Sequence, residues 1–372
     1  MDLGFSKSEK LLVESARRFL EKEAAGIFRE AELAKEGYSR QLWHKMAELG
    51  WMGILFPGQY QGMDGNILEL ILLLEEMGRA LVPGPFIATM ISGYGLWRYG
   101  TKMQKEELLP ALTAGRQIII PCFMASELTG GAVNRKEQAD FKDDHYRLSA
   151  TRLFVSYAQS ADWFLYEAAT RAGKTLFLVP ANAPGISCRL IETLAADRQC
   201  ELVLDRVNVS ASNIVGTEDG GAEIINEIQQ WGALCESAYI LGLLEKVLEM
   251  AVKHAKIREQ FGRPIGSFQA IQHQCADMVT DIDKLKFLTY RAAWKLSAHA
   301  SAGREIHMAK ARASDASRRV TLLGIKIHGG VGITQEYDLQ FYFRRAKAAE
   351  TTFGDGDLHR EFVARSLGLG AS

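Results

Sequence analysis

The stretch REQFGRPIGSFQAIQH, residues 258–273, decides the fold, and it lies between two long segments with helical periodicity. Residues 223–258 before it and 268–300 after it carry apolar side chains three and four positions apart, which predicts helices. A helix–helix connection needs only turn residues such as Gly and Pro. This one also contains an Arg that suits bidentate pairing with a phosphate, and Phe and Gln side chains that suit an adenosine. The candidate ligand-binding residues are Arg258, Gln260, Phe261, Phe268 and Gln269.

Three zones follow from the same reading of the rest of the chain. Residues 1–115 carry helical patterns, and residues 223–372 are helical again, with a further long segment at 304–327. Between them, residues 116–222 contain short aliphatic and aromatic runs bounded by Gly, Asn, Asp and Pro, which predict an antiparallel barrel or sandwich. The sequence therefore predicts an α+β fold with a β-domain between two helical domains.

Composition excludes several classes of function. The 372 residues include 44 basic and 45 acidic side chains, a net charge of −1, so no nucleic acid or anionic membrane partner is expected. No apolar stretch is long enough to span a bilayer, and the first 20 residues do not form a secretory signal. Five scattered cysteines favour free thiols in a reducing cytoplasm. The eight histidines show no metal-ligand spacing, so no metal is expected.

Two segments of the β-zone and one near the C-terminus could hold a polar heterocycle. Ser126 ends a predicted strand before a Gly pair, which is either a polar turn or a cofactor clamp. Phe154 and Ser156 lie on the same side of one predicted strand, where they could stack on and bond to a flat ring, or Phe154 could be ordinary core. Gly329 and Gly330, in IHGGVG, would let the backbone approach a pyrophosphate closely.

Together these segments resemble the acyl-CoA dehydrogenase family over nearly the whole chain. The most specific match is REQFGRPIGSFQ, which fits the family's RxxFGxxxxxFQ signature, with FMASELTGG, FVSYAQSADWF and IHGGVGITQEYDLQFYFRRAK in support. The resemblance implies an N-terminal helical domain, a central β-domain and a C-terminal four-helix bundle. It also implies FAD, with Ser126, Phe154 and Ser156 beside the flavin ring. The remaining cofactor contacts would come from Arg258, Gln260, Phe261, Phe268, Gln269, Gly329, Gly330 and Asp355, largely across a subunit interface.

One departure from the family bears on catalysis. Where most members carry a glutamate as the catalytic base, in the stretch ETTFGDGDLHRE (350–361), this chain has Phe353. Phenylalanine cannot accept the alpha proton of a thioester, so the base must lie elsewhere. Some relatives carry it on the first long helix of the C-terminal domain, where the nearest carboxylate here is Glu236, which could equally be a structural carboxylate. Asp355 is a second candidate, although its place in the family usually faces the cofactor.

The FGDxxxHR ending resembles a branch of heteromeric acyl-CoA dehydrogenases that often act on cyclic, aromatic or steroid-derived acyl-CoAs. The resemblance implies α,β-dehydrogenation of an acyl-CoA by a dimer of dimers, with a second related subunit or a copy of this chain, and an electron-transfer flavoprotein or similar acceptor. The base could then come from the partner subunit. Two alternatives remain: a catalytically silent FAD-binding scaffold subunit, or a non-redox lyase or hydratase acting on an acyl-CoA.

Overall fold

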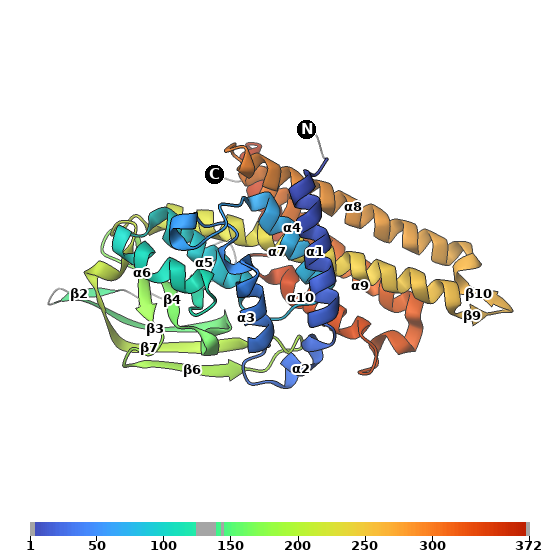
Figure 1. Ribbon diagram of the computed structural model, residues 1–372, viewed down its shortest axis with the longest axis horizontal. Helices are drawn as coiled ribbons and strands as arrows, with labels where there is room; N and C mark the ends of the chain where they lie inside the picture. Colours follow the sequence, from blue (N-terminus) through green and yellow to red (C-terminus); the bar gives the residue numbers. More distant parts are fainter. Residues whose placement is uncertain (1–3, 124–138, 143–144, 370–372) are drawn as a thin grey trace. The chain divides into compact units, whose positions relative to one another are not determined.

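The computed structural model describes residues 4–123, 139–142 and 145–369. It confirms the predicted α+β fold class, with helices first, strands in the middle and long helices last (Figure 1). The first zone contains α1 (Lys7–Glu23), α2 (Ile27–Leu33), α3 (Arg40–Glu48), α4 (Ile67–Arg79), α5 (Phe86–Tyr99) and α6 (Lys102–Thr113), with short 3₁₀ turns η1 (Trp51–Gly53) and η2 (Gly58–Tyr60). No helix in the described part of the chain is long and apolar enough to cross a membrane.

Two compact units divide the chain, and each is described by itself. One contains residues 29–66 and 83–232, and the other contains residues 1–28, 67–82 and 233–372. We call them the sheet unit and the bundle unit. The long helix α7 (Gly221–Ile257) begins in the sheet unit, and most of it belongs to the bundle unit.

The sheet unit is built on two four-stranded sheets. The first has the order β1-β4-β5-β8, and the second has the order β2-β3-β7-β6. β1 and β4 pair in parallel, and the other neighbouring strands of these two sheets are antiparallel. The strands are β1 (Ile119–Cys122), β2 (Asp140–Lys142), β3 (His145–Ser156), β4 (Trp163–Ala169), β5 (Lys174–Pro180), β6 (Ile186–Ile191), β7 (Gln199–Ser210) and β8 (Ile214–Val215).

The two sheets differ in burial. The central five residues of β4 and of β5 are all buried, so both faces of this pair are covered, as their continuous apolar sequences indicate. β6 is an edge strand with four exposed residues beside β7, and Figure 1 shows β3, β7 and β6 lying next to one another. The register between β3 and β7 shifts between Arg152 and Val155. Phe154 lies in that shift with φ +59, so the strand bulges where the resemblance puts a flavin contact.

The bundle unit is formed by α1, α4 and the long helices of the C-terminal zone. These are α7, α8 (Gln269–Ser297), α9 (Gly303–His328), α10 (Leu339–Thr351) and α11 (Gly356–Ser366). α4 and α7 cross at backbone contact, because a Cβ on Gly78 would lie 2.0 Å from the Tyr239 carbonyl oxygen and one on Gly242 would lie 1.7 Å from the Glu75 carbonyl oxygen. Only glycine fits at these two crossing positions.

α7 and α9 run in the same direction and contact each other at two levels. A Cβ on Gly324 of α9 would lie 2.7 Å from Val247 Cγ1 of α7. Further toward the C-terminal ends, the rings of His254 on α7 and His328 on α9 stack with centroids 4.4 Å apart. These two contacts fix the register of the two helices.

Candidate active site

The flavin-ring residues predicted in β3 lie on either side of a buried residue. Phe154 is 63% exposed, Val155 is buried, and Ser156 is half-buried, so Phe154 and Ser156 share a face. Gln199 Nε2 donates to Ser156 Oγ over 2.9 Å. Because the amide is the donor, the Ser156 hydroxyl keeps its own proton for an acceptor atom. Ser126, predicted to bond the flavin, lies outside the described residues.

The signature segment forms a small hairpin at the end of α7. β9 (Glu259–Gln260) pairs with β10 (Arg263–Pro264), and the 3₁₀ turn η6 (Ile265–Ser267) leads into α8. The tip residue Phe261 has φ +56 and is 93% exposed. Arg258, Gln260 and Gln269 are also exposed, while Phe268 is half-buried under the guanidinium of Arg263 at 4.2 Å. Exposed aromatic and amide groups on an ordered hairpin are typical of a surface that binds a ligand or another chain.

The predicted glycine pair lies at the same end of the bundle unit. Gly329 and Gly330 follow α9 directly and begin the 3₁₀ turn η7 (Gly329–Ile333). Gly329 has φ +67, and a Cβ at either glycine would have no atom within 4 Å, so the backbone here is accessible. The preceding residue His328 stacks on His254, one turn before Arg258. Within this unit the structure therefore brings the glycine pair and the start of the Arg258 hairpin to one end of α7 and α9.

The loop that carries Phe353 is held by a pair of buried histidines. Phe353 has φ +58, and its carbonyl oxygen accepts from His359 Nε2 over 2.9 Å. The carbonyl can only accept, so His359 Nε2 is protonated and its Nδ1 accepts from His307 Nδ1, 2.9 Å away. Burial lowers the pKa of both imidazoles to about 4, so both rings are neutral near pH 7.

The other residues of the FGDxxxHR ending stabilise the same turn. Asp355 caps α11, where its Oδ1 accepts from the backbone N–H groups of Asp357 and Leu358 at 3.1 and 2.9 Å. Arg360 donates to both oxygens of Asp315 on α9. The predicted cofactor contact Asp355 is thus also a helix cap, and these local bonds account for several of the motif's residues.

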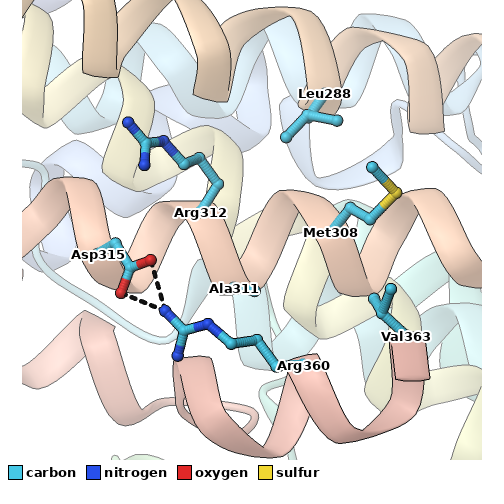
Figure 2. A pocket seen from close by; sticks show the side chains of 7 residues that line it. All are labelled: Leu288, Met308, Ala311, Arg312, Asp315, Arg360 and Val363. Atoms are coloured by element: carbon cyan, nitrogen blue, oxygen red, sulfur yellow. Dashed lines mark hydrogen bonds and ion pairs between the residues drawn. The ribbon is translucent and has the colours of Figure 1, made fainter. Parts of the chain in front are cut away.

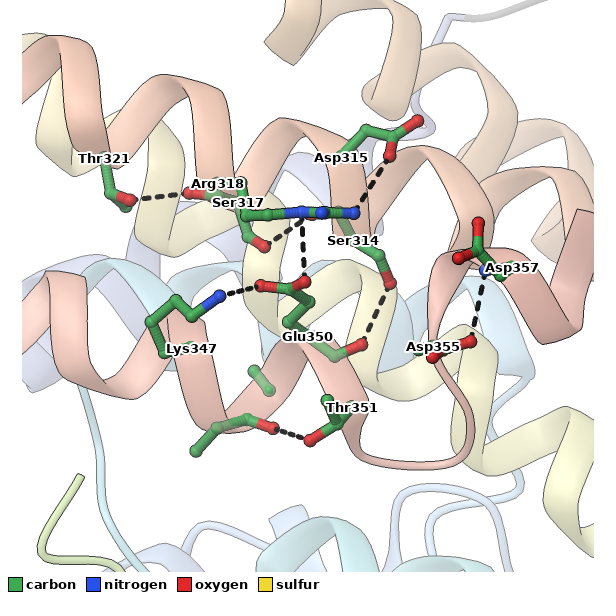
Figure 3. A network of polar contacts seen from close by, with 12 residues as sticks. Ser314, Asp315, Ser317, Arg318, Thr321, Lys347, Glu350, Thr351, Asp355 and Asp357 are labelled. Carbon is green, nitrogen blue, oxygen red and sulfur yellow. Dashed lines mark hydrogen bonds and ion pairs between the residues drawn. The ribbon is translucent and has the colours of Figure 1, made fainter. Parts of the chain in front are cut away.

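Lys310 is a residue of this region that the sequence analysis did not single out. Its side chain has 0% exposure, and its Nζ donates to the carbonyl oxygens of Ala349 and Glu350, at 3.1 and 2.9 Å, at the end of α10. Ser314 Oγ donates to the same Glu350 oxygen over 2.9 Å (Figure 3). Burial lowers the pKa of Lys310 to about 8, against the charges of Glu236, Glu350 and Asp355, which act to raise it. Its signal in the sequence is a lysine at four- and three-residue spacing from Ile306 and Ala313, on the apolar and small-residue side of α9.

Glu236, the candidate base, lies on α7 and is 8% exposed. Its neighbours Cys235, Ser237 and Ala238 are completely buried. Burial of a carboxylate is costly unless charge or hydrogen bonds compensate, so this residue has a specific local role. Among the described residues, no group of three or more His, Cys, Asp or Glu side chains is arranged to hold a metal ion.

A groove of about 290 Å³ lies between α8, α9 and α11 (Figure 2). It is lined mainly by Leu288, Met308, Ala311 and Val363, with the Arg360–Asp315 ion pair at one side. None of the predicted site residues that the structure describes lines this groove.

Comparison with known proteins identifies the class. The family model "Acyl-CoA dehydrogenase, N-terminal domain" matches residues 6–116, and "Acyl-CoA dehydrogenase, C-terminal domain" matches residues 219–368. Acryloyl-CoA reductase (NADH) of Anaerotignum propionicum is 30% identical, over 99% of this chain and 96% of its own length. The chain therefore belongs to the acyl-CoA dehydrogenase family. The family catalyses FAD-dependent dehydrogenation of acyl thioesters, an oxidation of CH–CH donors.

Three solved structures are similar over nearly their whole length. A chain of the ChsE4-ChsE5 complex from Mycobacterium tuberculosis has a TM-score of 0.92 and 27% identity, and each chain is covered completely. A variant of the Tcur3481-Tcur3483 steroid ACAD has a TM-score of 0.87 and 27% identity, with 97% of this chain and 98% of that chain covered. PigA with FAD and proline has a TM-score of 0.91 and 26% identity, with 99% and 100% covered.

The residues present fit the family's FAD. In the sheet unit, Gln199 Oε1 is buried without a hydrogen-bond partner among the described residues, beside a serine whose proton is available. In the bundle unit, the backbone at Gly329 and Gly330 is open and Arg258 is exposed, so these residues would offer N–H groups and a cation to a pyrophosphate.

Proposed function

We propose that this protein dehydrogenates a cyclic, aromatic or steroid-derived acyl-CoA at its alpha and beta carbons, as one subunit of a heteromeric enzyme, with Glu236 as the base. The observation that carries the proposal is a buried carboxylate on α7, in a protein whose usual base position is Phe353. FAD, when bound, accepts the hydride from the beta carbon. The chain itself must then orient the thioester, exclude water and accept the alpha proton.

The other buried carboxylates described in the bundle unit are committed to ion pairs that join helices. Glu76 accepts from two nitrogens of Arg17, and Asp281 pairs with Arg312 and Arg319. Three more members of this group follow the same rule: Glu75 with Lys286, Glu305 with Lys295, and Glu350 with Lys347 and Arg318. Removing the cation of any of these pairs would leave a buried carboxylate without its partner, so the pairs have a structural role. Glu236, the remaining buried carboxylate described in this unit, lies on the helix where some relatives of this family carry their base.

The heteromeric part of the proposal is supported by two neighbours whose titles name two components, ChsE4-ChsE5 and Tcur3481-Tcur3483. The second title also names a steroid ACAD, which supports a bulky polycyclic acyl group. An electron-transfer flavoprotein or a similar protein would reoxidise the flavin, and the assembly would be a dimer of dimers.

The test is Glu236→Gln, compared with Glu249→Gln on the same helix, whose side chain is half exposed and contacts Lys246. The amide is nearly isosteric but cannot accept a proton, so anaerobic bleaching of the flavin by a steroid-derived acyl-CoA should slow by 100-fold or more while substrate binding persists. The Glu249 variant should bleach at the wild-type rate.

A Glu236→Gln variant that bleaches normally would show that the base is supplied by another group. Wild-type protein that bleaches only after its partner subunit is added, and equally well with Gln at position 236, would assign the base to that partner. Phe353→Glu is the converse experiment: a carboxylate restored at the usual position should create or increase activity toward a linear acyl-CoA.

A further inference from the structure

The register of α7 and α9 determines which residues face each other one helical segment earlier. His254 of α7 and His328 of α9 stack on one another, with ring centroids 4.4 Å apart. Glu236 precedes His254 by 18 residues, and Lys310 precedes His328 by the same 18 residues. Eighteen residues make five turns of an α-helix and a rise of about 27 Å. Since the helices run in the same direction, Glu236 and Lys310 return to the facing sides at the same level.

We infer that Lys310 is a positioning residue that pairs with the Glu236 carboxylate and keeps it ionised. The inference rests on the proposed role of Glu236 as the base. A base must be deprotonated before it meets the substrate, and a cation close to a buried carboxylate favours its charged form.

Both side chains of the inferred pair, Lys310 and Glu236, are buried. Lys310 is completely buried and Glu236 is nearly so, which strengthens the interaction of their charges relative to water. The Lys310 ammonium also donates to the last carbonyls of α10, those of Ala349 and Glu350, where the negative end of the helix dipole favours a cation. Lys310 therefore bonds to the end of α10, just before the loop that carries Phe353.

The other charged and titratable groups around Lys310 have separate partners. The Glu350 carboxylate pairs with Lys347 at 2.7 Å and with Arg318 at 3.0 Å, so only its backbone oxygen meets Lys310 (Figure 3). Asp355 caps α11. His359 is neutral and bonded to the Phe353 carbonyl. Among the charges that act on Lys310, that of Glu236 has the largest influence, ahead of Glu350 and Asp355.

A double-mutant cycle tests the pair. Lys310→Gln keeps a donor for the α10 carbonyls but removes the charge, and it is combined with Glu236→Gln in the holoenzyme, with its partner subunit where activity requires one. The unfolding equilibrium is measured in urea at pH 7.5. Lys310→Gln should raise the equilibrium constant of unfolding in both backgrounds. We expect the rise to be at least tenfold smaller when Glu236 is already Gln, because no carboxylate is then left without its cation. An additive cycle would overturn the inference.

The pH dependence of flavin reduction gives a readout that a purely structural role would not change. In Lys310→Gln, the acid limb of the pH–rate profile should move to higher pH by about one unit or more, because the carboxylate base loses the cation that favours its charged form. The matched control is Lys347→Gln, which removes a neighbouring cation that contacts Glu350, and its profile should stay at the wild-type position. If Lys310→Gln does not fold, Lys310→Met with the same cycle replaces it, and a limb that stays in place overturns the inference.

Failure of the proposed function can be told apart from failure of this inference. If Glu236→Gln reduces its flavin normally, Glu236 is not the base, while a coupled stability cycle still supports the charge pair. Glu236→Gln could abolish flavin reduction while the stability cycle is additive and the acid limb of Lys310→Gln is unshifted. That result would support Glu236 as the base and contradict the positioning role of Lys310.

Discussion

Replacing His359 and His307 with glutamine should flatten the acid side of the protein's stability profile. Both imidazoles have a pKa lowered from 6.5 to about 4 in the folded protein, chiefly by burial. Below pH 6.5 these two histidines become protonated in the unfolded chain, whereas in the folded protein they stay neutral until about pH 4. The free energy of unfolding therefore falls as the pH falls through this window, and it is unaffected above it.

The magnitude follows from the two pKa values. Between pH 7.5 and pH 5 each histidine should remove about 2 kcal/mol from the free energy of unfolding, and the pair about 4 kcal/mol if they act independently. His359→Gln retains an N–H that can donate to the Phe353 carbonyl, so the variant should fold. At pH 7.5 it should be less stable than wild type, because the bond with His307 Nδ1 is altered.

Urea unfolding at several pH values between 5 and 7.5 measures this difference. The single variant should lose about half of the extra pH dependence, and the double variant most of it. His145→Gln is the matched control, because this histidine lies exposed at the start of β3 in the sheet unit. A double variant whose stability declines with pH as steeply as that of wild type would refute the burial argument.

Two further predictions concern the cofactor and the loop. Arg258→Ala should weaken FAD binding to the apoprotein by about 30- to 150-fold, because it removes one bidentate charge-assisted contact of about 2–3 kcal/mol. Lys253→Ala, in the last turns of the preceding helix α7, should not weaken it, and an Arg258 variant that purifies with full flavin contradicts the assignment. Gly354→Ala should lower the melting temperature by several degrees, because φ at this position is +98 and the new Cβ would lie 2.7 Å from Leu358 Cδ2. An unchanged melting temperature would show that the loop can move to accept the methyl group.

Local patterns determined much of the fold. The periodicity predicted helices at 223–258, 268–300 and 304–327, and the structure has them at Gly221–Ile257, Gln269–Ser297 and Gly303–His328. Strands were predicted in the middle zone for the same reason, since alternation and turn residues act over a few positions. The FAD and Phe353 assignments came from motifs whose members lie close together in the chain, and the individual cofactor contacts stay predictions.

Only the tertiary structure decided which distant side chains meet. The bulge that gives Phe154 its φ of +59 arises from pairing with β7, some 45 residues later in the chain. The sequence of the strand alone does not predict it. The pairing that we infer for Glu236 and Lys310 depends on the packing of α7 against α9, which α8 separates in the chain. The bond from His359 to the Phe353 carbonyl depends on how the loop before α11 closes onto that helix. The period of apolar residues indicates which face of a helix or strand is buried. Which side chains of other elements pack on that face is determined by contacts between elements far apart in the chain.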